Sequence, residues 1–181
     1  MTASPPVARS YARPMGQNQR SQIVMSDEEI ATFLEQSRTA TMATIGPNGM
    51  PHLVAMWYGL IDGRIYFETK GKSQKVQNLR RDPRIVVAVE SGDTYDQLRG
   101  VSIEGNAVLI EDTEADEYWA AGISLFERYQ GTYTEEMHPF VEVMMNKRVA
   151  VRVEPTRVRS WDHRKLGMDP MPLAGSTAEF L

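Results

Sequence analysis

Cysteine is absent from this chain of 181 residues. Its absence excludes disulfide bonds, thiolate metal ligands, iron–sulfur clusters and a cysteine nucleophile. Long hydrophobic runs are absent as well, since no stretch approaches the roughly 18 apolar residues that a membrane-spanning helix needs. The first residues also lack the apolar core of a signal peptide. We therefore expect a cytoplasmic protein without a membrane span.

Positive charge is not in excess either. The chain carries 20 lysines and arginines against 24 aspartates and glutamates, a formal net charge of −4 at pH 7. This balance argues against a protein whose main surface binds nucleic acid, so we expect no nucleic-acid partner. A local cluster of basic residues in such a chain points instead to a small anion.

Metal and nucleotide motifs are missing too. No two of the three histidines stand four residues apart, which gives no support to a metal site. Gly71-Lys72-Ser73 resembles the end of a Walker A loop, but Tyr66 stands where that motif needs a glycine. Neither a dinucleotide-binding glycine fingerprint nor a hydrolase nucleophile motif occurs. If the chain is an enzyme, we expect a bound cofactor to supply the reactive atoms.

The length suits a single domain with one substantial core. Residues 1–22 are rich in proline and polar side chains, which predicts a flexible N-terminal arm. Residues 23–167 form the predicted cofactor-binding domain. Residues 168–181 contain prolines and a glycine and show no periodic pattern, so we expect a C-terminal tail there.

Periodicity gives the expected elements in chain order. Ser26 and Glu29 have capping-box spacing, and apolar residues then recur on one face, which predicts a helix over 26–37. Turn signals at 46–49 and 62–63 divide the next segment into three strands, which we expect to pair as a meander. These strands cover 39–45, 50–61 and 64–70. Further strands are expected over 85–89, 101–110 and 149–153, the last resuming toward 161, with helices over 73–82, 113–130 and 135–146.

These elements predict a mainly β protein. About six strands, few helices and several strands that are apolar on both faces favour a β-barrel with flanking helices over an open sheet. A β-sandwich would show a similar pattern and stays open as an alternative.

One strand-to-helix junction carries unusual charge. Three lysines fall within six positions of it, at Lys70, Lys72 and Lys75. The start of a helix offers unpaired backbone N–H groups and the positive end of its dipole, and Ser73 stands at the N-cap position. Thr69, on the inward side of the preceding strand, adds a hydroxyl. The junction suits a monoester phosphate, although a solvated lysine face on a surface helix would show the same spacing.

The strand that follows the first turn is rich in apolar and aromatic side chains, from Leu53 to Tyr58. Together with the junction it would seat a phosphorylated aromatic cofactor. Ordinary core packing is the alternative for Trp57 and Tyr58. His52 lies on the same strand, where a structural histidine with satisfied hydrogen bonds is the alternative to a ligand contact.

Three segments of the sequence resemble the pyridoxamine-5′-phosphate-oxidase-like split β-barrel superfamily. They are Thr41 to His52 (TMATIGPNGMPH), Ile65 to Thr69 (IYFET) and Ser73 to Arg84 (SQKVQNLRRDPR). The third segment is the more specific, and it is similar to the branch of flavin and deazaflavin oxidoreductases that use coenzyme F420. The resemblance covers about residues 26–162. It implies an FMN-binding-like, six-stranded split barrel that forms a homodimer.

The resemblance also implies where the cofactor lies. Its phosphate is expected at the junction and its ring along the second strand, while the loop around Tyr95 to Arg99 of the partner subunit closes the site. The cofactor-binding residues expected on this basis are His52, Val54, Met56, Trp57, Thr69, Lys70, Gly71, Lys72, Ser73, Gln74, Lys75 and Asn78, with Tyr95, Leu98 and Arg99 contributed by the partner subunit.

The function that the resemblance implies is a reductase that passes a hydride from reduced F420 to a small conjugated organic substrate. The glutamate tail of F420 needs cations beyond the phosphate, and Arg80, Arg81 and Arg84, with the arginines of the arm, would meet it. FMN needs only the phosphate site. An FMN-binding oxidase or reductase of the same fold and a non-catalytic F420- or FMN-binding protein are the alternatives.

Overall fold

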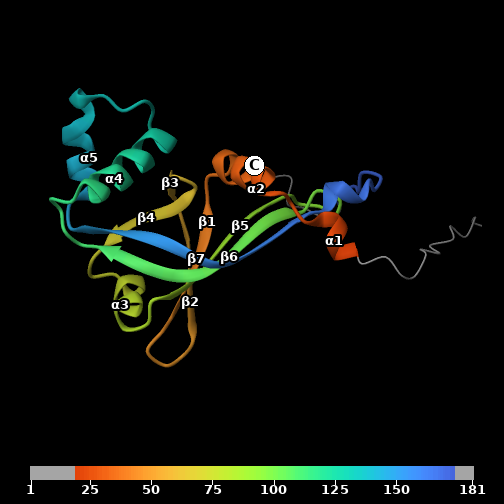
Figure 1. Ribbon diagram of the computed structural model, residues 1–181, viewed down its shortest axis with the longest axis horizontal. Coiled ribbons are helices and arrows are strands. Elements are labelled where there is room, and N and C mark those ends of the chain that lie inside the picture. The colour runs from red at the N-terminus through yellow and green to blue at the C-terminus, as the bar shows by residue number, and fades with distance from the viewer. Residues whose placement is uncertain (1–18, 174–181) are drawn as a thin grey trace, which may run out of the picture.

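The computed structural model describes residues 19–173 (Figure 1). One antiparallel sheet curls into a half-barrel, and helices lie against it, so the predicted mainly β fold with flanking helices is confirmed. In chain order the elements are α1 Gln19–Ile23, α2 Asp27–Gln36, β1 Ala40–Ile45, β2 Pro51–Met56, β3 Gly59–Ile61, β4 Arg64–Lys70, α3 Gln74–Arg81, β5 Arg84–Ser91, β6 Arg99–Ile110, α4 Asp116–Tyr129, η1 Glu135–Met137, α5 His138–Met145, β7 Arg148–Asp162 and η2 His163–Leu166.

Local sequence signals mark the ends of several elements as expected. In the capping box of α2, the Glu29 backbone N–H donates to the Ser26 hydroxyl at 3.2 Å, and the Ser26 N–H donates to the Glu29 carboxylate at 2.6 Å. The predicted helix over 26–37 is therefore confirmed. Gly49 and Gly63 have positive φ angles of 80° and 74° in the two hairpin turns, where glycine costs least.

The sheet contains seven strands in the order β2-β1-β5-β6-β7-β4-β3. The prediction of six strands was wrong because the segment 50–61 is divided, with β2 ending at Met56 and β3 beginning at Gly59. These two strands lie at opposite edges of the sheet, so the expected meander is also wrong. Trp57 and Tyr58 join the two edges, and neither is a glycine or proline that would have marked the break.

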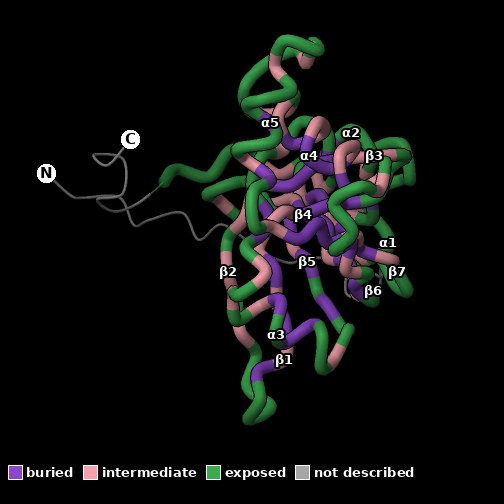
Figure 2. The backbone as a smooth tube through the Cα atoms, turned by 90° about the vertical axis from the view of Figure 1, so that its left-hand side faces the viewer, coloured by how far each residue is buried: buried purple, intermediate pink, exposed green. Residues whose placement is uncertain are grey.

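The inner side of the half-barrel holds the main core. Phe67, Val87 and Val101 are fully buried there, and α2 and α3 add Phe33 and Val76. Burial of each such side chain stabilises the fold by about 1.5–3 kcal/mol. Figure 2 shows the buried segments running through the middle of the sheet, whereas β2 is only intermediate or exposed along its length.

A second core lies on the outer side of the sheet. There α4 and α5 cover β4 and β7, and Tyr66, Tyr118 and Ala150 are buried together (Figure 1). The alternation along β4 predicts an outward face for Tyr66 and Glu68. That face is covered by helices rather than by water, because the apolar stripe of α4 packs on it.

The longest ladder joins β6 to β7, from Arg99 opposite Asp162 to Ile110 opposite Ala150. The predicted last strand is thus one continuous element, which a β-bulge between Glu104 and Gly105 distorts. A Cβ atom on Gly105 would lie 2.2 Å from a backbone carbonyl oxygen of β7, so the bulge requires glycine at this position.

The predictions for the two ends of the chain fall mostly outside the residues that the structure describes. The expected arm over 1–22 lies outside the described residues except for the part that enters α1, and the expected tail over 168–181 is described only to residue 173. Both stay predictions. Between residues 19 and 173, we find no helix whose length and apolar character would let it cross a membrane.

Candidate functional site

The junction between β4 and α3 has a geometry that suits a bound anion. Ser73 is the N-cap residue of α3, with φ −68° and ψ 152°, yet its side chain makes no capping hydrogen bond. Its hydroxyl lies 3.4 Å from the hydroxyl of Thr69, which is buried on the inner face of β4. Two hydroxyls and the backbone N–H groups of a first helical turn therefore come together here.

The three lysines of the junction differ in their surroundings. Lys75, in the first turn of α3, is half-buried, and burial together with the nearby Arg148 lowers the pKa of its ammonium group. Lys70 and Lys72 are exposed, and Lys70 points to the side of β4 opposite to Thr69. Of the three lysines, only Lys75 is partly withdrawn from water.

A row of polar side chains joins α3 to β1, beside His52 of β2. Gln74 donates through Nε2 to Asn78 Oδ1 at 2.8 Å, and the buried Asn78 donates through Nδ2 to Thr44 Oγ1 at 3.0 Å. Thr44 stands opposite His52 in the β1–β2 ladder. The Nδ1 atom of His52 is buried and has no hydrogen-bond partner among residues 19–173. A buried polar atom without a partner is what a ligand group would satisfy.

A pocket of about 370 Å³ lies where the end of β2 approaches β4, α4 and α5. One wall is Trp57, which is 56% exposed and stacks on Tyr129 with ring centroids 4.4 Å apart and planes within 7°. Glu68 and Arg148 form an ion pair in the same pocket at 3.4 Å. The full lining is Met56, Trp57, Glu68, Leu125, Tyr129, Gln130, Met144 and Arg148.

Sequence reasoning missed Glu68, Arg148 and Tyr129. Glu68 is on the outward side of β4, and burial raises the pKa of its carboxyl group while Arg148 opposes the rise. Its Oε2 atom is buried without a hydrogen-bond partner in the described part of the chain. The signal that could have found it is the apolar stripe of α4, which needs the outer face of a strand to cover.

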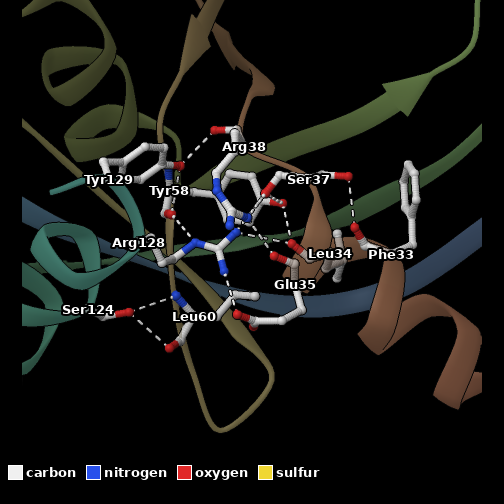
Figure 3. Close-up of polar contacts among 10 residues, drawn as sticks. All are labelled: Phe33, Leu34, Glu35, Ser37, Arg38, Tyr58, Leu60, Ser124, Arg128 and Tyr129. Atoms are coloured by element: carbon white, nitrogen blue, oxygen red, sulfur yellow. Dashed lines mark hydrogen bonds and ion pairs between the residues drawn. The ribbon is translucent and has the colours of Figure 1, made fainter. Parts of the chain in front are cut away.

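One arginine holds α4 against the connection between β2 and β3 (Figure 3). The Arg128 guanidinium donates to the carbonyl oxygens of Tyr58, Leu34 and Ser37 at 3.0, 3.2 and 2.7 Å. It also lies 4.8 Å above the Tyr58 ring, whose hydroxyl donates to the Leu34 carbonyl oxygen at 2.6 Å. Burial raises the pKa of that hydroxyl to about 12. This contact fixes the last turn of α4, which carries Tyr129 into the pocket wall.

The loop expected from the partner subunit lies at the other end of the half-barrel. Tyr95 contacts the His163 ring with centroids 4.4 Å apart, and Arg99 lies 5.2 Å above the Phe33 ring. Both follow the end of β5 that is remote from α3 (Figure 1). Within one chain, Tyr95, Leu98 and Arg99 are therefore separated from the junction.

A larger pocket lies between α1, α2 and the turn at 62–63, with a volume of about 960 Å³. Val24, Ile30 and Leu60 give it apolar walls, and its lining includes none of the expected cofactor-binding residues. Among the residues that the structure describes, no cluster of His, Asp and Glu could hold a metal ion. The junction of β4 and α3 with the adjoining pocket is therefore the candidate site.

The elements that build this site all lie in one stretch of the sequence, from α2 to the end of β7. Residues 26–162 match the family model described as pyridoxamine 5′-phosphate oxidase. The chain belongs to this family. The resemblance noted in the sequence is thereby confirmed, and the half-barrel agrees with the split barrel of the pyridoxamine 5′-phosphate oxidase family. No curated protein matches the chain.

Several solved structures are similar to this pyridoxamine 5′-phosphate oxidase family member, with different sequence identities. A conserved hypothetical protein from Mycobacterium tuberculosis is 58% identical with a TM-score of 0.84, and the match covers 89% of this chain and 99% of that one. An F420 reductase is 25% identical with a TM-score of 0.56, covering 74% and 98%. An FAD-binding protein from Mesorhizobium loti, 16% identical with a TM-score of 0.56 over 76% and 93%, shows the fold alone.

Proposed function

We propose that the chain is a cytoplasmic F420-dependent oxidoreductase, in which reduced F420 supplies a hydride to a small conjugated organic substrate. The observation that carries the proposal is the β4–α3 junction, where Thr69, Ser73 and Lys75 offer two hydroxyls and a half-buried ammonium group at a helix start. The similarity to an F420 reductase supports the choice of a deazaflavin.

The chain would hold the cofactor at two places, its phosphate and its ring. Lys75 and the hydroxyl pair would hold the phosphate by charge-assisted and ordinary hydrogen bonds. The ring would lie along β2, whose inward side chains His52, Val54 and Met56 are half-buried. The unpartnered Nδ1 atom of His52 would gain a hydrogen bond there.

FMN is the alternative cofactor because the same donors would hold its phosphate. Arg80, Arg81 and Arg84 each make hydrogen bonds or ion pairs within the chain, which weakens the argument that they receive the glutamate tail of F420. The exposed Lys70 and Lys72 are the cations left beside the junction for that tail. A binding protein without turnover is the third possibility.

The proposal is tested by titrating the purified protein with F420 and separately with FMN, and following cofactor fluorescence. We expect saturable binding of F420 and weaker binding of FMN, and then substrate-dependent oxidation of reduced F420. Tighter binding of FMN would assign the chain to the flavin enzymes instead. F420 binding without oxidation by any conjugated substrate would support a binding protein.

The outer face of β2, β1 and β5 supports a homodimer. Leu53 is 62% exposed and Val86 39%, and both stand opposite the small side chain of Ala43 on the central strand. No helix of the described chain covers this face, unlike that of β4 and β7. A contiguous apolar face of this kind favours burial against a second subunit.

Val86→Glu is therefore expected to convert a dimer into a monomer, because a carboxylate would lose its water in the interface. Light scattering coupled to gel filtration measures the mass. Val143→Glu, at a position 77% exposed on α5, is the matched control and should leave the mass unchanged. A wild-type protein that is monomeric at micromolar concentration would rule the dimer out.

A further inference from the structure

The pocket between Trp57 and α4 has the size and walls of a small-molecule site. Its volume of about 370 Å³ falls in the range of roughly 300–1,000 Å³ that ligand pockets occupy. The stacked rings of Trp57 and Tyr129 form a flat wall, and Met56 and Met144 add adaptable apolar surface. Such walls suit a flat, conjugated ring.

Two polar groups in this pocket give it a chemical preference. Glu68 faces Arg148 at 3.4 Å through Oε1, while its Oε2 atom is buried and lacks a donor within residues 19–173. The side chain is only 11% exposed, so water does not readily replace that donor. Arg148 offers further N–H donors beside it. Glu68, one of the lining residues, therefore brings an unpaired acceptor next to the Arg148 donors.

The pocket and the phosphate donors lie on different sides of β4. Glu68 and Thr69 are neighbours in the strand, so their side chains point to opposite faces. The two places are nevertheless adjacent, since Glu68 lines the pocket and the next residue, Thr69, carries one of the two hydroxyls of the junction. Met56 and Trp57, at the end of β2, line the pocket. A ligand here would lie beside a cofactor bound at the junction without occupying the phosphate position.

We propose that this pocket is the substrate site, and that it takes a flat conjugated ring with an N–H or O–H group next to a carbonyl oxygen. The ring donor would bind Glu68 Oε2, and the carbonyl oxygen would accept from Arg148. The assignment to substrate rests on the proposed function, whereas the donor–acceptor preference of the pocket does not.

Two bicyclic probes of the same shape test the preference by calorimetry with the wild-type protein. Carbostyril carries a ring N–H next to its carbonyl, and coumarin carries a ring oxygen in that place. We expect carbostyril to bind at least about tenfold more tightly, because its N–H satisfies a buried charged acceptor that coumarin leaves unpaired. Equal affinities, or tighter binding of coumarin, would overturn the proposal.

Substitutions locate the effect at Glu68. Glu68→Met should abolish the preference for carbostyril and leave coumarin affinity within about threefold, because the acceptor is removed while Arg148, the donor to the carbonyl oxygen of both probes, stays. Glu154→Met is the matched control, since Glu154 pairs with Arg64 and Arg152 outside the pocket, and it should keep the preference. A preference that survives in folded Glu68→Met would overturn the assignment. The comparison of carbostyril with coumarin on the wild-type protein tests the preference without needing any variant to fold.

Repeating the carbostyril titration with the protein saturated by F420 separates substrate from cofactor. Binding of both together supports a substrate site beside the cofactor. Displacement of carbostyril by F420 would show that the pocket holds the cofactor ring, and would overturn the substrate assignment. If F420 fails to bind while the preference for carbostyril persists, the donor–acceptor pocket is supported and the proposed function fails.

Discussion

Arg128→Ala is expected to lower the free energy of unfolding by about 3 kcal/mol or more. The Arg128 side chain is 7% exposed and donates to three backbone carbonyl oxygens, of Tyr58, Leu34 and Ser37. Two of these carbonyls end α2 and the third lies between β2 and β3. Alanine would remove the charged donor from each and leave them the neutral hydroxyls of Tyr58 and Tyr129, at a place where three elements meet (Figure 3). Urea unfolding followed by tryptophan fluorescence measures the loss.

The ion pair of Arg128 provides the control for this prediction. Glu35 bonds the same guanidinium at 3.1 Å, but its side chain is 68% exposed. Glu35→Ala should therefore lower the free energy of unfolding by less than about 1 kcal/mol. Equal losses in the two variants would show that Arg128 acts as a surface ion pair and would refute the role given to its carbonyl contacts.

Lys75→Ala is expected to weaken F420 binding by about 1.5–3 kcal/mol, or roughly 10- to 150-fold. Lys75 is half-buried in the first turn of α3, and its pKa is already lowered by burial and by Arg148, so a bound phosphate would relieve an unfavourable charge. Fluorescence titration at fixed ionic strength measures the change.

Lys72→Ala removes the same charge three residues away, at an exposed position. Its effect should stay below about threefold even where it meets the glutamate tail, because exposed charges are screened by water and salt. The comparison therefore separates a direct contact from general attraction of an anion. Unchanged F420 affinity in a folded Lys75→Ala protein would mean that the phosphate binds elsewhere.

Local chemistry made much of this fold predictable. Ser26 and Glu29 predict the start of α2, and Gly49 and Gly63 predict the hairpin turns. These signals are readable because each depends on residues within a few positions. The order of the strands is set by pairing between distant segments. No local pattern shows that β2 and β3, separated only by Trp57 and Tyr58, belong to opposite edges.

Part of the candidate site could likewise be predicted from local sequence, and part could not. The hydroxyls of Thr69 and Ser73 and the N-terminus of α3 lie within one short segment, and their arrangement follows from a strand that ends in a helix. Glu68, Arg148 and Tyr129 come together only because α4 covers the outer face of β4. That packing depends on side chains some sixty to eighty positions apart in the sequence.

The place of β7 in the sheet has a consequence for the growing chain on the ribosome. Within the described sheet, the hairpin of β3 and β4 is hydrogen-bonded to the remaining four strands only through β7, which is the last strand to be synthesised. Until the first part of β7, to residue 152, has emerged, the β3–β4 hairpin shares no sheet with the β1–β2 hairpin, and its apolar face is open to other nascent chains. We therefore expect the domain to fold after translation of its last strand rather than stepwise, and to rely on chaperones in that interval.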